Sequence, residues 1–205
     1  MASIEFVIGN TIAFFTRKND MPPLPPPFRR AFDAPTTPVT LITTQLIDQA
    51  VEGSRQSDRR RIILPLHKSA DDVLHRMFNA LQPGTYIPPH RHALPPKAES
   101  ILVVRGALCF VTFDDQGQIT QMADLAAGSS VIGVDVEAGV FHTFFALEPD
   151  TVVFEVKSGP YSATNDKDFA DWAPREGDVL AESYLERLQA ERLALPNNMV
   201  KVRPI

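Results

Sequence analysis

The stretch ESILVVRGALCFVTFDDQGQITQMADL, residues 99–125, decides the fold. Two apolar runs, SILVVRGALCFVTF and ITQMADL, are separated by the polar segment DDQGQ. Apolar runs bounded by turn residues are typical of strands, and a short break containing Asp and Gly between two of them predicts a β-hairpin. The stretch therefore predicts antiparallel strands joined by a tight turn.

The same pattern of apolar runs separated by turn residues extends on both sides of this hairpin, from about residue 61 to residue 157. The turn segments QPG, AAGSS and EPD interrupt the apolar runs, and turn signals recur at intervals of roughly ten residues. The further apolar runs are RIILPLH, HRMFNAL, TYIPPHRH, SSVIGVDV, VFHTFFAL and TVVFEVK. This spacing predicts an all-β protein, an antiparallel β-sandwich or barrel.

The flanking segments differ in composition from this β region. Residues 21–38 contain seven prolines, a density that favours an extended arm or spacer over a ligand for another domain. Helical spacing of apolar side chains predicts one helix within 43–55, with Gly53 just past its end, and a second over 178–195 before Pro196. We expect three parts: an N-terminal extension with a proline-rich arm (1–40), the barrel (41–165), and a C-terminal segment with a helix packed on the barrel (166–205).

The overall charge restricts the class of partner. The 205 residues carry a formal net charge of −5, with a pI near 5.5. An acidic chain has no general attraction for nucleic acid or anionic lipid, so we expect a small-molecule ligand, with sheet edges available for a homodimer.

Cys109 lies in an apolar run, so we expect a buried structural thiol. The N-terminus lacks a basic residue before its short apolar part, so we expect a soluble, cytoplasmic protein.

Four polar side chains in the β region form a candidate metal site. His90 and His92 are two residues apart on a predicted strand and would share one face. Glu99 and His142 each head an otherwise apolar row, and a buried carboxylate needs a cation partner. His142 taken alone reads as a structural histidine, but together the four residues are a ligand set suited to Fe, Mn, Ni, Cu or Zn, with coordination positions left for water or substrate.

These residues resemble the two motifs of the cupin superfamily. The first motif is a glycine, five residues, His-Xxx-His, a glutamate, six residues and a glycine, and it is matched by Gly84, His90, His92, Glu99 and Gly106. Gly139 and His142 match the second motif. The chain departs from the common pattern in the longer gap before Glu99, in Glu137 where proline is usual, and in Ala146 where asparagine is usual. The resemblance implies a jelly-roll sandwich, also called a double-stranded β-helix, flanked by the N-terminal arm and the C-terminal helix.

A closer resemblance covers most of the chain from about Arg55 onward. Four blocks are similar to the WbuC family of cupin-fold metalloproteins, which accompanies bacterial O-antigen polysaccharide gene clusters: RRRIILPLH, ADDVLHRMFNALQPGTYIPPHRH, FEVKSGPY and NDKDFADWAPREG. The long gap before the glutamate and a Lys-Xxx-Glu pattern, here Lys97-Ala98-Glu99, are usual in that family. Asparagines that its members tend to carry before the position of His67 are absent here, where residues 62–65 are Ile-Ile-Leu-Pro.

Three further residues are candidate catalytic groups. Tyr86 lies four residues before His90 and faces the metal if the strand is regular, although the prolines between them can bend the chain and leave Tyr86 structural. Lys97 has the same parity as Glu99 and reads either as an anion-binding or acidic group or as a solvated surface lysine. Glu155 and the lysine two residues later either form an outer ion pair or enter the pocket.

Other polar and aromatic groups have simpler readings. The arginines at 59–61 are a solvated face or an anion clamp at the barrel mouth, and His67 is a better site candidate than His75, although both read as structural. Phe169 and Trp172 are spaced as an aromatic latch that holds the C-terminal segment on the barrel.

Two functions follow from these patterns. The first is a metal-dependent enzyme, an isomerase, epimerase or dioxygenase that acts on a small oxygen-rich, sugar-related compound of bacterial surface polysaccharide metabolism, with Fe, Mn, Ni or Zn as the metal. The second is a binding module that holds a carbohydrate or a carboxylate without turnover. Fold analogy does not separate the two.

Overall fold

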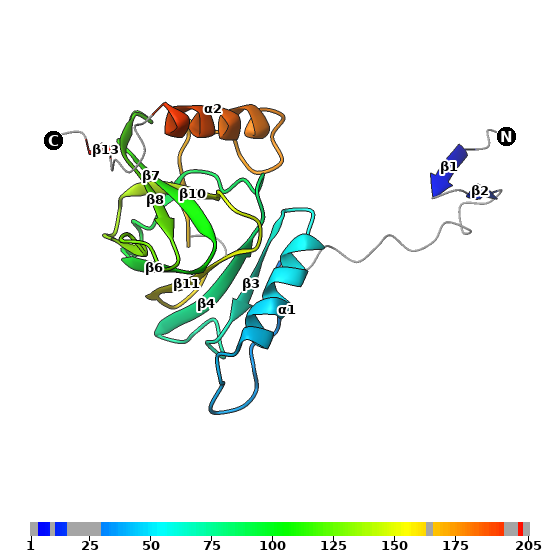
Figure 1. Ribbon diagram of the computed structural model, residues 1–205, viewed down its shortest axis with the longest axis horizontal. Coiled ribbons are helices and arrows are strands. Elements are labelled where there is room, and N and C mark those ends of the chain that lie inside the picture. Colours follow the sequence, from blue (N-terminus) through cyan, green and yellow to red (C-terminus); the bar gives the residue numbers. More distant parts are fainter. Residues whose placement is uncertain (1–3, 9–10, 16–29, 163–165, 195–200, 203–205) are drawn as a thin grey trace.

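The folded body is a sandwich of two antiparallel sheets (Figure 1) in a computed structural model that describes residues 4–8, 11–15, 30–162, 166–194 and 201–202. The six-stranded sheet has the order β12 (Asp168–Phe169), β5 (His90–Arg91), β10 (Phe141–Ala146), β7 (Ala107–Phe113), β8 (Ile119–Ala126), β13 (Lys201–Val202). The five-stranded sheet has the order β3 (Arg61–Pro65), β4 (Leu74–Leu81), β11 (Thr151–Ser158), β6 (Glu99–Arg105), β9 (Gly133–Val136). β1 (Ile4–Ile8) and β2 (Thr11–Phe15) pair with each other.

The chain crosses repeatedly between the two sheets. β4, β6, β9 and β11 belong to the five-stranded sheet, whereas β5, β7, β8 and β10 belong to the six-stranded sheet. This alternation is the connectivity of a jelly roll. The fold is therefore a jelly-roll β-sandwich, and the all-β prediction is confirmed.

The predicted hairpin joins β7 to β8. Asp114 N donates to Gln118 O at 3.0 Å, and the Asp114 carboxylate accepts from the backbone N–H groups of Gln116 and Gln118 at 3.0 and 2.8 Å. Gly117 has φ +79°, a conformation that costs glycine little. Local turn chemistry therefore fixes this hairpin, as its sequence predicts.

The main core fills the space between the sheets. Ile101 and Val153 of the five-stranded sheet pack with Leu108, Phe110 and Phe144 of the six-stranded sheet, and all five side chains are buried. The apolar rows predicted from strand parity thus meet inside the sandwich. This core leaves one end of the interior to polar side chains, which form the site described below.

Helix α1 (Thr44–Arg55) covers the outer face of the five-stranded sheet (Figure 1). Ile47, Ala50 and Val51 pack on β3 and β4, as the helical spacing predicts. The helix does not end before Gly53, which lies inside it. A Cβ at Gly53 would stand 2.7 Å from the ring of Phe32, so glycine permits close packing of this ring rather than terminating the helix.

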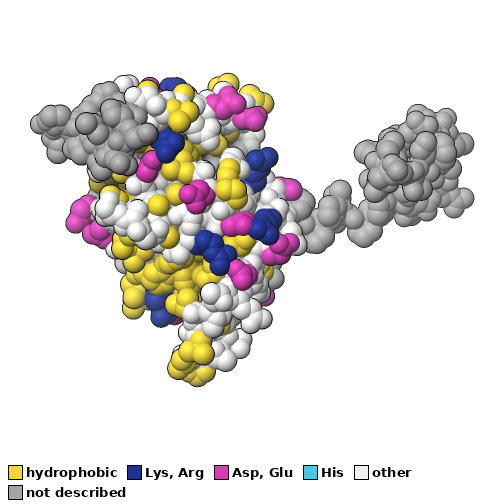
Figure 2. Space-filling model, in the orientation of Figure 1, with side chains coloured by type: hydrophobic (Ala, Val, Ile, Leu, Met, Phe, Trp, Pro, Cys, Tyr) yellow, Lys and Arg dark blue, Asp and Glu magenta, His cyan; other side chains and the backbone are white. Residues whose placement is uncertain are grey.

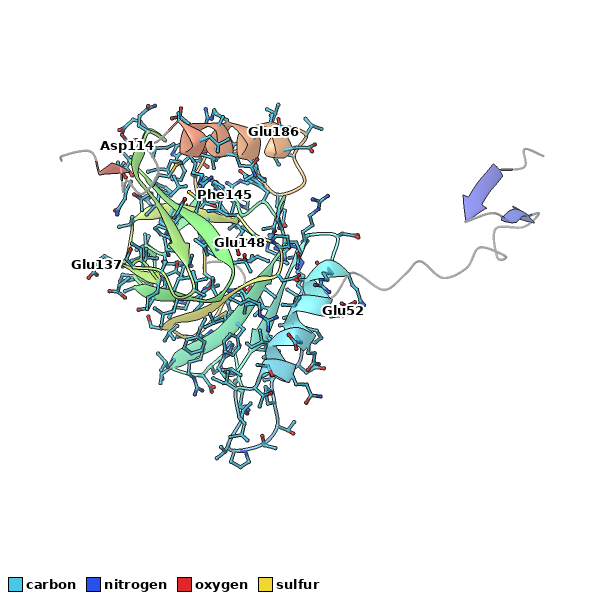
Figure 3. The ribbon with its side chains drawn as sticks, in the orientation of Figure 1. Glu52, Asp114, Glu137, Phe145, Glu148 and Glu186 are labelled. Carbon is cyan, nitrogen blue, oxygen red and sulfur yellow. The ribbon has the colours of Figure 1, made fainter. Side chains whose placement is uncertain are left out.

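Helix α2 (Ala181–Leu193) covers the outer face of the six-stranded sheet. Tyr184, Leu185 and Leu188 pack with Phe145 of β10, which Figure 3 labels between that strand and the helix. The exposed side chain of Glu186 lies on the side of α2 away from the barrel. The C-terminal helix predicted over 178–195 is thus present and docks as expected.

The surface of the body is mixed in character. Figure 2 shows charged side chains of both signs, together with an apolar area over the part of the body where β4, β6 and β11 lie in Figure 1. Leu74, Leu102 and Val104 are exposed on these strands, at 44 to 47% of their full area. Among the helices described, none combines the length and apolarity that crossing a membrane requires. The proline-rich segment predicted at 21–38 lies partly outside the described residues.

Candidate metal centre

β5 and β10 place two histidines opposite each other. His90 and His142 are directly paired in the antiparallel ladder, and their ring centroids are 4.6 Å apart. The segment 86–92 is not one regular strand, because prolines 88 and 89 cannot donate to a ladder, and β5 contains only His90 and Arg91. His92 follows this short strand, with its ring 5.2 Å from that of His90.

Glu99 comes from the opposite sheet, at the start of β6. Its Oε1 lies 2.7 Å from Nε2 of His142, and its Oε2 lies 3.5 Å from Nε2 of His92. One candidate ligand atom from each of the four residues, His90 included, lies within 4.8 Å of all the others, and all four residues are buried. The structure thus brings together every residue predicted as a metal ligand.

Backbone carbonyl groups orient all three imidazoles. Each ring directs Nδ1 at a carbonyl oxygen, which can only accept, so Nδ1 carries the proton of the neutral ring. The acceptors are Pro88 for His90 (3.0 Å), Val140 for His142 (2.9 Å) and Asp166 for His92. Each Nε2 therefore presents a lone pair to the centre of the cluster. Histidine ligands of metal ions are commonly held in this way.

The free atoms of the cluster fit a metal ion. Nε2 of His92 and Nε2 of His142 are buried without a hydrogen-bond partner, although the Glu99 carboxylate is close to both. Ligand bonds of about 2.0–2.2 Å separate neighbouring donor atoms by roughly 2.9–3.5 Å. The 3.5 Å separation of Glu99 Oε2 from His92 Nε2 lies in this range, and the 2.7 Å separation of Glu99 Oε1 from His142 Nε2 lies just below it. The cluster is therefore able to hold a divalent transition-metal ion.

The charge states of the cluster agree with metal binding. Burial lowers the pKa of His90 well below its ordinary value, and the positive charge of Lys167 acts in the same direction. Burial acts to raise the pKa of Glu99, but the contacts from His142 and His92 outweigh it and hold that pKa well below its usual range. Neutral imidazole and ionised carboxylate are the forms that bind metal.

A cavity of about 720 Å³ opens beside the cluster, and His90 and Glu99 line it. Small-molecule sites commonly have volumes of about 300–1,000 Å³. Glu155 lines the same cavity and accepts a 2.6 Å hydrogen bond from Nδ2 of Asn79. Burial raises the pKa of Glu155, and the charge of Glu99 raises it further. The sequence left two arrangements open for Glu155 and Lys157, and the structure has the inward one, with both side chains buried.

Lys97 has neither of the arrangements expected for it. Its ammonium is buried, donates to Pro160 O at 2.6 Å and to Asp166 Oδ1 at 3.1 Å, and is not among the groups that line the cavity. Lys157 donates to the other oxygen of Asp166 at 3.0 Å. Because the backbone oxygen of Asp166 accepts from His92, this ion-pair cluster secures the segment that orients one member of the metal centre. Sequence reasoning missed Asp166.

Tyr86 lies away from the cavity. Its ring packs edge-on to Tyr184 of α2, with centroids 6.0 Å apart, and its hydroxyl donates to Pro174 O at 2.7 Å. The expectation of a metal-facing Tyr86 required regular strand geometry, which the following prolines remove. Burial raises the pKa of Tyr86. Of the three predicted catalytic residues, Glu155 is the one that lines the cavity.

The C-terminal segment is fastened to the barrel by aromatic and ionic contacts. Trp172 packs on Phe113 and Phe141, with ring centroids 5.0 and 5.8 Å apart, as the predicted latch requires. Phe169 instead lies near His90, with centroids 6.1 Å apart, and lines the cavity. Glu176 forms ion pairs with Arg59 and Arg61, two of the three arginines at 59–61. These two side chains are therefore neither simply solvated nor free to bind an anion.

The remaining histidines form a pair at the cavity. The rings of His67 and His75 stack with centroids 4.1 Å apart, and both residues line the cavity. Each ring also contacts a backbone oxygen, Arg76 O at 3.0 Å for His67 and Ala70 O at 3.1 Å for His75. These contacts agree with the structural reading of the two residues.

Comparisons with known proteins leave the chemistry of the site open. A family model described as a domain of unknown function (DUF6016) matches residues 42–125. No curated protein matches the sequence. Similar solved structures include KdgF from Halomonas sp. (21% identity, 51% of this chain and 82% of that chain, TM-score 0.39) and a Cellulomonas parahominis L-ribose isomerase with L-ribose (18% identity, 55% and 70%, TM-score 0.43).

A third similar structure is the capsular polysaccharide assembling protein CapF from Staphylococcus aureus, at 20% identity and TM-score 0.42 over 52% of this chain. The match spans 28% of the CapF chain. Similarities this remote concern the fold alone, which rests here on the chain's own strand order. The narrower resemblance to the WbuC family stays a prediction.

Proposed function

We propose that this chain is a metal-dependent enzyme that acts on a small, oxygen-rich, sugar-related compound, with an isomerase, epimerase or dioxygenase type of reaction. The proposal rests on one observation: four buried ligand atoms converge within 4.8 Å beside a cavity of small-molecule size. The resemblance to the WbuC family supports a substrate from bacterial surface polysaccharide metabolism.

The residues around the centre have separable roles in this proposal. His90, His92, Glu99 and His142 would hold the ion, which when bound supplies Lewis-acid polarisation of substrate oxygen atoms or redox chemistry. Glu155 would accept or donate a proton through its carboxyl oxygen atoms, and burial together with the charge of Glu99 raises its pKa, which favours the protonated form more than in an exposed glutamate. Asn79 holds this carboxyl group by donating to Oε2.

A non-catalytic binding module is the second candidate. Two of the predicted catalytic groups favour it, because other protein atoms already bind them. The Tyr86 hydroxyl donates to Pro174 O, and the Lys97 ammonium binds Asp166. This leaves Glu155 as the one predicted proton carrier at the cavity. A binding module needs no proton carrier, so the role of Glu155 separates the two candidates.

The test is turnover by protein reconstituted separately with iron(II), manganese(II), nickel(II) and zinc(II). Each form is incubated in air with a panel of nucleotide sugars, and products are followed by NMR and mass spectrometry. The proposal predicts conversion of at least one compound. It also predicts that Glu155→Gln retains the metal but lowers kcat by about 10²–10⁴-fold. Sugars that bind to every metal-loaded form and are recovered unchanged would establish the binding module instead.

A further inference from the structure

The charges that line the cavity are not balanced. Among the described residues, six cationic side chains and five carboxylates face it. The cations are Arg30, Arg59, Arg61, Lys68, Lys157 and Lys167, and the carboxylates are Asp33, Glu99, Glu155, Asp166 and Glu176. A divalent ion at the metal centre adds two further positive charges. The loaded cavity is therefore positive, and an anionic ligand is the one that this field favours.

Three of the six cations have carboxylate partners, and Lys68 donates to Pro35 O. Lys157 donates to Asp166 at 3.0 Å, and two arginines share Glu176. Neither Arg30 nor Lys167 has such a partner among the described residues, and Lys167 is the one whose charge acts on His90 and Glu99 of the metal centre. In the part of the chain that the structure describes, no hydrogen bond or ion pair within 4.0 Å engages its ammonium group. Lys167 is thus a cation at the cavity without a protein acceptor.

Lys167 lies where it can act on a bound ligand. It follows directly after Asp166, whose backbone oxygen orients His92, and it precedes β12, which pairs with β5 of the metal centre. Its charge acts on His90, Glu155 and Glu99. Lys167 is an exposed residue, so a ligand can reach it. Burial by the surrounding protein and the charge of Lys157 lower the pKa of its ammonium group. An ammonium group in this position gains more from an anionic partner than a fully solvated lysine does.

We propose that Lys167 is the specificity-determining residue of the cavity and binds a carboxylate or phosphate group of the substrate. The inference rests on the proposed function, because it requires the ligand to occupy the cavity beside the metal centre. It narrows the substrate class to anionic sugar derivatives, namely sugar acids or sugar phosphates. Exposed Phe169, which lines the same cavity, offers an apolar surface to the sugar ring.

The test is calorimetric titration of the zinc-loaded full chain with three probes: glucuronate, glucose 6-phosphate and glucose. Glucuronate and glucose share a ring and differ in charge at carbon 6, so the comparison isolates the anionic group. We expect at least one anion to bind at least tenfold more tightly than glucose, because a hydrogen bond between two charged partners is stronger than one between an ammonium group and a neutral hydroxyl group. Whether the carboxylate or the phosphate binds more tightly identifies the source of the charge.

Variants assign the effect to Lys167. Lys167→Met should abolish the preference for the anion, and Lys167→Arg should restore most of it. Lys68→Met is the matched control, because Lys68 also lines the cavity but donates to Pro35 O; its affinities should equal those of the wild type. Equal affinity for the anions and glucose, no binding of either anion, or unchanged anion affinity in Lys167→Met overturns the proposal. Zinc content is measured on every sample, so loss of the metal centre is distinguished from loss of the anion subsite.

Discussion

The substitution Asp166→Asn tests the ion-pair cluster that supports the metal centre. Asp166 is 5% exposed and accepts from Lys97 at 3.1 Å and from Lys157 at 3.0 Å. Removal of its charge leaves two buried ammonium groups without this counter-ion, and broken buried ion pairs cost about 3–5 kcal/mol. Asparagine keeps one acceptor oxygen, so we expect the low end of that range, about 3 kcal/mol.

Urea unfolding of the metal-free protein measures this cost. With an m-value of about 2 kcal/mol/M, the midpoint should fall by roughly 1.5 M. Asp168→Asn is the control from the same segment, because Asp168 is 53% exposed and pairs with Arg91 at 3.2 Å. Exposed pairs contribute about 0–1 kcal/mol, so its midpoint should hardly move. A loss below 1 kcal/mol in Asp166→Asn would refute the structural role assigned to the cluster.

The same variant gives a pH signature. Burial acts to raise the pKa of Asp166, but the charge and hydrogen bond of Lys157 and the hydrogen bond of Lys97 lower it below its ordinary value. A depressed folded-state pKa stabilises the protein above the unfolded-state value of about 3.9, and this stabilisation is lost as the pH falls through the folded-state pKa. Acidification below about pH 5 should therefore destabilise the wild type more than Asp166→Asn. An equal loss of unfolding free energy in the two proteins on acidification would contradict this.

Three further outcomes are expected. Chelation should lower the Tm, since a metal at one hundred times its Kd adds about 2.7 kcal/mol of stability; an unchanged Tm after verified removal would contradict metal binding. His92→Ala should lose the metal while keeping the far-UV circular dichroism of the wild type, because apolar strands supply the core; full metal content would exclude His92 as a ligand. Leu188→Ala, which removes a buried side chain, should cost about 2–5 kcal/mol, whereas Leu193→Ala, at an exposed position of the same helix, should cost less than about 0.5 kcal/mol; equal losses would contradict the docking of α2.

Local rules predicted the parts of the fold that depend on local chemistry. The β7–β8 hairpin follows from an aspartate and a glycine in its turn, and the inward row of Glu99, Ile101 and Val103 follows from strand parity. The same parity argument failed for Tyr86, because two prolines interrupt the extension that it assumes. Gly53 was read as a helix end, whereas close contact with Phe32 explains it. Such long-range packing has no local signal.

The candidate site likewise contains residues that local rules predicted and residues that they did not. The four metal-centre residues were predicted from parity and motif spacing, and the structure brings them together. The inward orientation of Glu155 could not be decided from alternation with apolar neighbours, since both faces of β11 are covered. Asp166 and Lys167 lie in the block NDKDFADWAPREG that resembles the WbuC family, but no spacing rule indicated their roles. Their positions depend on the pairing of β12 with β5 across a long stretch of sequence.

The most direct test of the central claim is an anomalous-scattering map from crystals of protein kept free of chelators. Data on both sides of the iron, manganese, nickel and zinc absorption edges identify the element. We predict a single strong peak about 2.0–2.2 Å from Nε2 of His90, His92 and His142 and from a carboxylate oxygen of Glu99. A metal-replete protein with no peak among these four side chains, or with its peak at another place, would contradict it.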